Sequence, residues 1–240
     1  MRAETDRQED GKVTRVVEVV VVAAGSGTRL RRSCPKALVP LCDKPIVVHA
    51  LEVFQKAGMI DGVVLVCPAD HRQAFEELCR TYALSKVRQV VAGGSQRHDS
   101  VRCGIAALRR QTTVIAVHDG ARPLIREVLI RRLLQASERY EAVIPGVPLK
   151  ATVKEVDPDG RYVRRTVDRR GLMEIQTPQV FHRSVLESVY KGTVPPETTD
   201  DAFLVEQAGG AVKVVEGDYR NIKITTPEDL LVAEAFLAEV

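Results

Sequence analysis

Short runs of valine and isoleucine alternate with longer stretches of helical periodicity from Val16 almost to the end of the chain. Strands that are buried on both faces of a parallel sheet read as such apolar runs, and each parallel pair needs a crossover connection, usually a helix. The clearest runs, each followed by a helical pattern, are Val17–Ala24, Gly62–Cys67, Lys86–Ala92 and Val114–His118. The alternation therefore predicts an α/β fold, with a mostly parallel, twisted sheet flanked by helices.

The alternation of apolar runs and helical patterns ends after a helical stretch at 124–140 and a short apolar run at 142–144. From about 147 to 175 the pattern becomes β-like on both sides of Asp157-Pro158-Asp159-Gly160, a composition that favours a tight turn. We expect a protruding two-stranded arm in this region. Because an isolated ribbon is only marginally stable in water, the arm is expected to pack on another surface, most economically that of an identical subunit. An insertion folded back onto its own chain is the alternative.

After the arm, helical patterns recur near 184–190 and 200–207, a β-like run follows at 212–215, and Pro227 begins a final helix. Residues 1–15 are polar, and we expect them to form a disordered tail before a single domain at 16–240. The first sixteen residues carry four bases and four acids, which differs from the basic start of a secretory signal.

Composition excludes several classes of function. The chain has 35 basic and 32 acidic residues, few aromatic residues and no tryptophan, so we expect no nucleic-acid binding. The longest apolar run, Val19 to Ala24, is far shorter than the roughly 20 residues of a membrane helix, so no membrane association is expected. Five cysteines without a C-x-x-C pair indicate neither a disulfide framework nor a zinc site, and favour the reducing cytoplasm.

The first predicted strand leads directly into Ala23-Ala24-Gly25-Ser26-Gly27-Thr28-Arg29-Leu30, where open α/β sheets bind phosphate ligands. Two glycines allow backbone N–H groups to approach an anion closely. Leu30 stands where the dinucleotide fingerprint needs a third small residue, and the Gly-Lys-Ser/Thr of a P-loop is absent. Neither a nicotinamide-binding fold nor an ATPase is therefore supported. A plain strand-to-helix turn is the alternative.

Two cations follow the glycines, Arg29 and then Lys36 in Cys34-Pro35-Lys36. Pro35 restricts the approach of Lys36 and the next residues are apolar, which argues against a solvated loop lysine. Cations converging on an anion held by glycines suit a polyphosphate. The fourth predicted strand ends in His118-Asp119-Gly120-Ala121-Arg122-Pro123, so its polar side chains are expected at the same edge of the sheet.

Seven motifs are weak singly and specific as a series: A-A-G-x-G-x-R, C-P-K, G-G-x-x-R-x-x-S, H-D-x-A-R-P, T-V-D-R, T-P-Q and N-I-K-x-T-x-P-E-D. With these motifs in this order, the chain from about Val16 to its end closely resembles the 2-C-methyl-D-erythritol 4-phosphate cytidylyltransferase family of the non-mevalonate isoprenoid pathway. The resemblance implies a Rossmann-like nucleotidyltransferase that joins CTP to methylerythritol phosphate and releases pyrophosphate. It also implies a homodimer formed through the arm.

The resemblance further implies a site for CTP. Arg29 and Lys36 would neutralise the triphosphate and stabilise the transition state, while Gly94 and Ser100 would read the cytosine base. A divalent cation such as Mg²⁺ is implied, held by the CTP phosphates with Asp119 as a candidate ligand. The implied CTP-binding residues are Ala23, Ala24, Gly25, Gly27, Gly94, Ser100, Asp119 and Gly120. Capping of the following helix is the alternative role for Ser100, for Asp119 and for Asp99, which we leave outside the site.

For the acceptor, the resemblance implies that Lys223 from a final strand and Arg169 from the arm act as catalytic cations, with Arg169 reaching into the site of a partner subunit. Thr152, Thr177 and Thr199 match positions that hydrogen-bond the acceptor. Several other arginines surround Arg169 on the arm, so a solvated surface role is the alternative for it. Arg122 is expected to be either catalytic or paired structurally with an acid.

Three other functions remain open from the residues. A ribitol-5-phosphate cytidylyltransferase would share the glycine loop and much of the fold. In a hexose-1-phosphate nucleotidyltransferase we expect a longer spacing between the glycine loop and Lys36. A catalytically silent nucleotide-binding module is the third, although binding CTP alone would not require acceptor cations such as Lys223.

Overall fold

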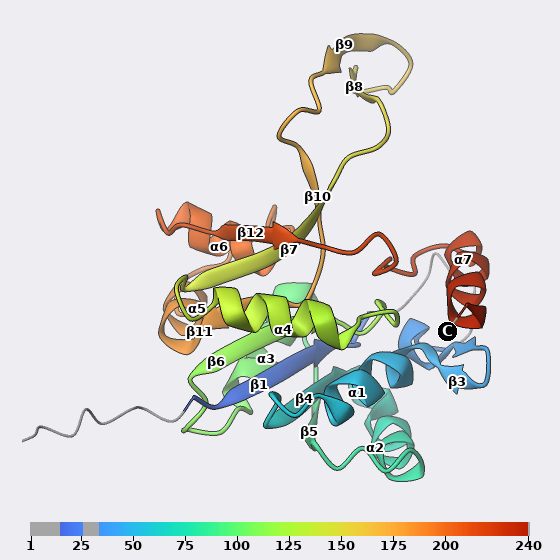
Figure 1. The fold of residues 1–240 in the computed structure, drawn as a ribbon, viewed down its shortest axis with the longest axis vertical. Coiled ribbons are helices and arrows are strands. Elements are labelled where there is room, and N and C mark those ends of the chain that lie inside the picture. Colours follow the sequence, from blue (N-terminus) through green and yellow to red (C-terminus); the bar gives the residue numbers. More distant parts are fainter. Residues whose placement is uncertain (1–14, 26–33, 240) are drawn as a thin grey trace, which may run out of the picture.

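The structure is a computed structural model that describes residues 15–25 and 34–239, so residues 1–14 of the expected tail lie outside the described residues. Four parallel strands form one half of its main sheet, in the order β6-β1-β4-β5. They are β1 (Val17–Val22), β4 (Gly62–Cys67), β5 (Val87–Ala92) and β6 (Val114–Asp119). Figure 1 shows this half with helices packed around it, which confirms the α/β prediction.

Alternate side chains of β1 enter two different cores. Val19 and Val21 pack with α1 (Ile46–Lys56), α2 (Arg72–Thr81) and α4 (Glu127–Ala136), whereas Val20 packs with α3 (Arg97–Ala106), α5 (Arg183–Tyr190) and α6 (Asp201–Gln207). Successive residues of a strand point to opposite faces, so a strand covered on both faces must be apolar at nearly every position. This burial explains the unbroken valine run of the sequence.

The other half of the sheet departs from the parallel pattern. β11 (Gln179–His182) lies antiparallel between β6 and β7 (Ala142–Pro148), and β12 (Lys213–Glu216) lies parallel to β7 on its other side. β10 (Met173–Ile175) pairs with the end of β7 and precedes β11 along the chain. The sequence predicted β7 only as far as Ile144 and did not predict β11, which has only four residues.

The predicted arm is present. β8 (Val153–Val156) and β9 (Val163–Val167) pair antiparallel as a separate two-stranded sheet, and Gly160 takes a positive φ of 69° in the turn between them. Figure 1 shows the arm projecting away from the main sheet, with its neck where β7 and β10 pair. Tyr162 near the turn is 74% exposed, so the described chain does not bury the arm on its own body.

The remaining elements frame one edge of the sheet. They are the 3-10 helices η2 (Lys36–Leu38) and η3 (Ala69–His71), the small hairpin of β2 (Pro40–Leu41) and β3 (Lys44–Pro45), and α7 (Pro227–Ala238). Residues 221–225 have no regular secondary structure, so the expected final strand around Lys223 was wrong. This segment forms no ladder with a neighbouring strand and is held by individual backbone and side-chain hydrogen bonds instead. Within the described ranges, each helix is too short or too polar to span a bilayer.

Candidate active site

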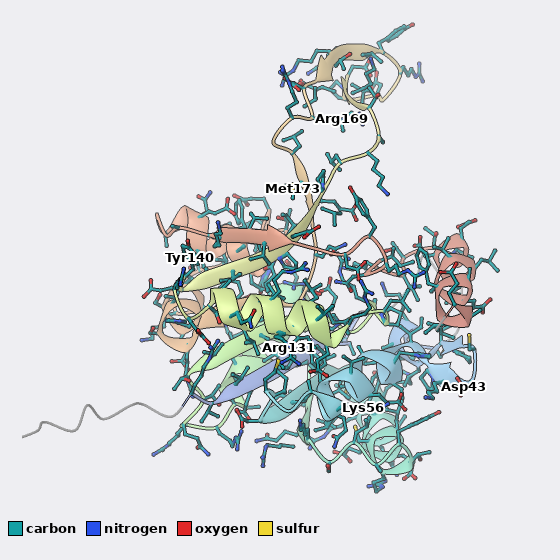
Figure 2. The ribbon with its side chains drawn as sticks, in the orientation of Figure 1. Asp43, Lys56, Arg131, Tyr140, Arg169 and Met173 are labelled. Carbon is teal, nitrogen blue, oxygen red and sulfur yellow. The ribbon has the colours of Figure 1, made fainter. Side chains whose placement is uncertain are left out.

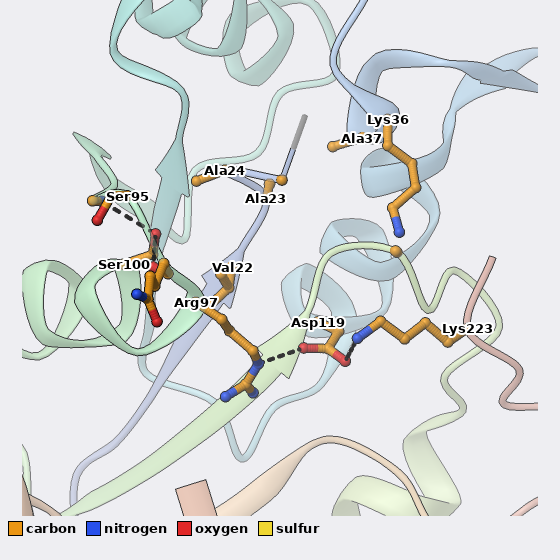
Figure 3. Close-up of a pocket in the computed structure, with 14 residues that line it drawn as sticks. Val22, Ala23, Ala24, Lys36, Ala37, Ser95, Arg97, Ser100, Asp119 and Lys223 are labelled. Atoms are coloured by element: carbon orange, nitrogen blue, oxygen red, sulfur yellow. Dashed lines mark hydrogen bonds and ion pairs between the residues drawn. The ribbon is translucent and has the colours of Figure 1, made fainter. Parts of the chain in front are cut away.

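A cavity of about 410 Å³ opens at the carboxyl ends of β1 and β6. Its lining comes from five separate parts of the chain, which Figure 3 shows facing one another: the turn after β1, η2, the turn before α3, the end of β6, and Lys223. Ligands of open α/β sheets bind at this edge because the connecting loops gather there. Lys36 and Lys223, 187 positions apart in sequence, line the same cavity.

Ala23, Ala24 and Gly25 line the cavity directly after β1. The Ala23 amide donates to the carbonyl of Val66 at 2.7 Å, which extends the pairing of β1 with β4 by one residue and fixes where the turn starts. Gly27 and Arg29, the other predicted residues of this loop, lie outside the described residues. Gly120 packs against Ala23, and a Cβ on Gly120 would lie 3.1 Å from the Cβ of Ala23. Gly120 therefore supports the turn after β1 by close packing.

The turn before α3 leaves no room for a side chain at its two glycines, Gly93 and Gly94. A Cβ on Gly93 would lie 2.6 Å from both the Ala24 Cβ and the Ser100 Oγ, so only glycine fits. Ser100 is buried inside α3, where its Oγ accepts from the Gly94 amide at 3.2 Å and donates to the Gln96 carbonyl. Asp99 instead closes the capping box with Gln96, so Ser100 is not the helix cap. Gly94 and Ser100 both line the cavity.

Asp119 is a buried carboxylate held among three cations. Its Oδ1 lies 3.2 Å from Arg97 Nε, and its Oδ2 lies 2.8 Å from Lys223 Nζ and 3.8 Å from Arg122 Nε. Burial alone would raise the pKa of Asp119, but Arg97 and Lys223 outweigh it and hold this pKa well below its usual range. The carboxylate therefore stays ionised and aims the ammonium of Lys223 at the cavity.

Arg97 is held from its other side by a second buried acid. Its Nη2 donates to Asp201 Oδ2 at 2.9 Å, and the Tyr190 hydroxyl donates to Asp201 Oδ1 at 2.5 Å. Burial opposes the charge of Arg97, but Asp201 and Asp119 together raise its pKa. Sequence reasoning missed Asp201 and Tyr190. The sequence offered only a weak signal for Asp201, because it stands two residues after Thr199 but its ion-pair partner, Arg97, is 104 positions away.

A second cavity of about 280 Å³ adjoins the first and shares Arg97, Asp119 and Lys223 with it. Thr177 and Thr199 line this second cavity. The Thr177 hydroxyl is buried, where it accepts from the Asp119 amide at 3.0 Å and lies 3.1 Å from His118 Nδ1. Thr177 thus helps to hold Asp119 in place. The shared residues form a charged wall between the two cavities.

Lys36 and Arg122 are connected to the segment that carries Lys223. Lys36 Nζ donates to the carbonyl of Ile224 at 3.0 Å. Arg122 is 6% exposed and donates to the carbonyls of Asn221 at 2.8 Å and Ile175 at 3.3 Å. The structural role considered for Arg122 therefore agrees with its geometry.

The predicted arm residues are not near either cavity within one chain. Thr152 is exposed at the base of β8, and Arg169 donates to the carbonyl of Lys150 on the opposite side of the arm. Figure 2 labels Arg169 on the projecting arm, beyond the neck that Met173 marks. A contact between these residues and the site thus requires a second chain.

The described residues offer no cluster of three or more His, Cys, Asp or Glu side chains that could hold a metal ion by itself. Asp119 is the one carboxylate among the described residues that line the larger cavity, and both its oxygens face cations. A divalent cation bound here fits these residues only if most of its oxygen ligands come from a bound phosphate chain.

His118, beneath Asp119, predicts how stability depends on pH. Its Nε2 lies 3.1 Å from the Arg122 carbonyl, which can only accept, so Nε2 carries the proton and Nδ1 accepts from Thr177. Burial lowers the pKa of His118 to about 4. Between about pH 4 and 6.5 the unfolded chain therefore binds a proton that the folded chain refuses, and stability falls as the pH falls, by up to about 1.4 kcal/mol per pH unit.

Urea unfolding of the wild type and of His118→Asn at several pH values in this window checks the expectation. The variant is less stable at pH 7 because it loses the Nε2 contact, but its stability should depend less on pH by about one proton. Parallel curves for the two proteins between pH 4.5 and 6.5 would show that His118 does not titrate as the structure requires.

A parallel sheet with lysines gathered around a glycine-rich turn at its carboxyl edge is typical of α/β enzymes that bind nucleotides, and the comparisons specify a nucleotidyltransferase. The family model described as 2-C-methyl-D-erythritol 4-phosphate cytidylyltransferase matches residues 17–239. The chain belongs to this family.

Individual relatives agree over nearly the whole chain. A protein of Alkaliphilus metalliredigens with the family's name is 44% identical over 224 residues, 92% of each chain. One of Geobacillus thermodenitrificans is 43% identical and covers 92% of this chain and 96% of its own. The crystal structure of 4-diphosphocytidyl-2C-methyl-D-erythritol synthase from Anaerococcus prevotii is 31% identical, with a TM-score of 0.79 over 93% of this chain and 99% of that one.

Proposed function

We propose that the protein transfers the cytidylyl group of CTP to 2-C-methyl-D-erythritol 4-phosphate, giving 4-diphosphocytidyl-2-C-methyl-D-erythritol and pyrophosphate in isoprenoid precursor biosynthesis. The observation that carries the proposal is the pair of adjoining cavities divided by Arg97, Asp119 and Lys223. The larger cavity is lined by the turn after β1 and by Lys36, as a nucleotide site would be, and the smaller one is lined by polar and charged residues that include Thr177 and Thr199. Two phosphorylated substrates can meet at such a wall.

In the proposed reaction an oxygen of the acceptor phosphate attacks the α-phosphorus of CTP in line with the leaving group. A new P–O bond forms, the bond to the β-phosphate oxygen breaks, and pyrophosphate leaves with that electron pair. The acceptor phosphate is already ionised at neutral pH, so the reaction needs no general base. Its barrier is chiefly accumulated negative charge, which fixed cations and backbone amides stabilise.

Lys36 and the loop that contains Gly27 and Arg29 would hold the triphosphate, and Lys223 would hold the acceptor phosphate. Asp119 keeps Lys223 in place by their 2.8 Å contact. Gly94 and Ser100 would read the cytosine edge, and Gly120 would support the ribose side. A divalent cation such as Mg²⁺, bound chiefly by the CTP phosphates beside Asp119, would neutralise charge on the transferring group.

The acceptor cavity would be completed by a second subunit. Thr177 and Thr199 line it within one chain, whereas Thr152 and Arg169 stand on the projecting arm. We propose a homodimer in which each arm brings Thr152 and Arg169 into the acceptor cavity of the other subunit. The exposed side chains of the arm support this assembly, because a ribbon of two strands gains little stability alone.

A cytoplasmic location is proposed on the state of the cysteines. All five are free thiols, including the buried Cys67. Burial raises the pKa of the Cys67 and Cys79 thiols to about 11, so both stay protonated and unreactive, as suits a reducing compartment.

The test of the function is release of pyrophosphate from CTP in the presence of Mg²⁺ and one acceptor at a time. We expect release with methylerythritol 4-phosphate, and at least about tenfold lower kcat/KM with ribitol 5-phosphate or with a hexose 1-phosphate. A preference for ribitol 5-phosphate would reassign the acceptor. Tight CTP binding without pyrophosphate release for any acceptor would identify a silent nucleotide-binding module.

A further inference from the structure

The position of Lys223 depends on individual hydrogen bonds, because residues 221–225 belong to no helix or strand. The Asn221 side chain donates to the Thr177 carbonyl at 2.9 Å, and the Ile224 amide donates to the Ala121 carbonyl at 2.8 Å. These contacts fasten the segment to the body of the molecule. One further contact joins the arm to Tyr219, which stands four residues before Lys223.

Tyr219 makes this contact with the neck of the arm. Its hydroxyl donates to the carbonyl of Pro148 at 2.8 Å, and the ammonium of Lys150 lies 3.5 Å from the centre of its ring. Pro148 is the last residue of β7, and Lys150 stands just beyond it on the way to β8. The Lys150 carbonyl in turn accepts from Arg169, so the contact lies next to a residue proposed to bind the acceptor.

The residues that precede Tyr219 are hydrogen-bonded to the body of the molecule and hold Tyr219 in place. Gln176 donates to the Asp218 carbonyl at 2.8 Å and accepts from the Asp218 amide at 3.1 Å. The Gly217 amide donates to the Gly146 carbonyl at 2.8 Å, which continues the pairing of β12 with β7. Tyr219 therefore joins a fixed part of the body to the start of a projecting ribbon.

We infer that Tyr219 is a positioning residue for the acceptor: it fastens the neck of the arm to the segment that carries Lys223. The inference rests on the proposed function, in which Lys223 and the arm each supply part of an acceptor site. In the proposed dimer, the arm that Tyr219 fixes enters the acceptor site of the other subunit. Each Tyr219 therefore stands next to the segment of Lys223 in its own subunit's site and holds the arm that completes the other subunit's site.

The physical effect is preorganisation. The arm projects from the sheet and is otherwise joined to the body through the short β7–β10 pairing. If the neck loses its contact with Tyr219, acceptor binding must also restrict the motion of the arm, and this lost freedom weakens binding. CTP occupies the other side of the charged wall, so its binding should be nearly unaffected.

The experiment measures both KM values and kcat for the wild type, Tyr219→Ala and Tyr219→Phe. We expect the acceptor KM to rise about fivefold to tenfold in Tyr219→Ala and about twofold in Tyr219→Phe, which keeps the ring under Lys150. KM for CTP should stay within about twofold of the wild type, because the arm is not part of the CTP cavity. The value of kcat should also stay within about twofold, because at saturating acceptor the bound acceptor holds the arm and its Arg169 in place. Lys150→Met tests the other side of the contact and should raise the acceptor KM about twofold.

Tyr140→Ala is the matched control. Tyr140 and Tyr219 are each 44% exposed, and each has a lysine ammonium over its ring, that of Lys213 at 5.4 Å in the case of Tyr140. Tyr140 precedes β7 and so lies at the opposite end of that strand from the neck, and Figure 2 labels it away from the arm. We expect Tyr140→Ala to retain the wild-type acceptor KM, with urea midpoints similar for both alanine variants.

The outcomes separate this inference from the function on which it rests. A wild type that releases no pyrophosphate with any acceptor contradicts the proposed function. An active wild type with the same acceptor KM in Tyr219→Ala and Tyr140→Ala overturns the inference and leaves the function standing. Equal rises in the KM for CTP and for the acceptor also overturn it, because they indicate a general effect on the fold.

Discussion

Replacing Lys36 with methionine is expected to lower kcat by about 10²-fold or more while the protein stays folded, because one fixed cation facing a transferring phosphoryl group can contribute about 3 kcal/mol to the transition state. Lys36 lines the larger cavity and donates to the carbonyl beside Lys223. Methionine keeps most of the apolar stem and removes the charge. Pyrophosphate release under saturating CTP and acceptor measures the effect.

The control for this variant is Lys86→Met. Lys86 also donates to a backbone carbonyl, that of Ala57 at 2.7 Å, but it is absent from the lining of both cavities described above. Both variants lose hydrogen bonds from a lysine ammonium to backbone carbonyls, since Lys86 also donates to the Phe54 carbonyl at 3.5 Å, and their urea midpoints should fall by similar, small amounts. A properly folded Lys36→Met protein with the kcat of Lys86→Met would remove Lys36 from the catalytic machinery.

Subunits that carry Lys36→Met and Arg169→Ala should complement each other in a mixed dimer. Each variant alone is expected to be nearly inactive, since every site lacks one cation. In a heterodimer, the body of the Arg169→Ala subunit keeps Lys36 and receives an intact arm from its partner, so one site of two is complete. We expect about half of the wild-type activity, far above either parent.

Co-expression of the two variants with different affinity tags, followed by purification over both, yields the heterodimer for this assay. The distance between the arm and both cavities within one chain requires complementation if Arg169 acts at all. A heterodimer as inactive as its parents would show that Arg169 does not act across the interface. If no doubly tagged species is recovered, the proposed dimer itself is wrong.

The main elements of the fold could be predicted because their signals are local. β4 runs from Gly62 to Cys67 as predicted, and the last helix begins at Pro227, as its proline indicated. β11 could not be predicted, because four residues inserted antiparallel between β6 and β7 carry no periodicity of their own. The final strand that the resemblance implied at Lys223 was wrong for a related reason: four residues are too few to specify a strand partner, and residues 221–225 form no regular element.

The residues of the site also fall into those that the sequence identified and those that it did not. Motifs close together in sequence identified Lys36, Gly94, Ser100 and Asp119, which all line the larger cavity. Asp201 escaped notice because its ion pair with Arg97, 104 positions away, leaves no mark on either local pattern, and Tyr190 was missed because its role depends on its hydrogen bond to Asp201.

The amino-acid order alone determined the alternation of strands and helices, the place of the glycine turn after β1 and the existence of the arm, since each follows from burial or backbone preferences of neighbouring residues. Only the tertiary structure decided that Arg97, Asp119 and Lys223 divide two cavities and that Tyr219 holds the neck of the arm. Such contacts join distant segments, and they form only where packing of the whole sheet brings those segments together.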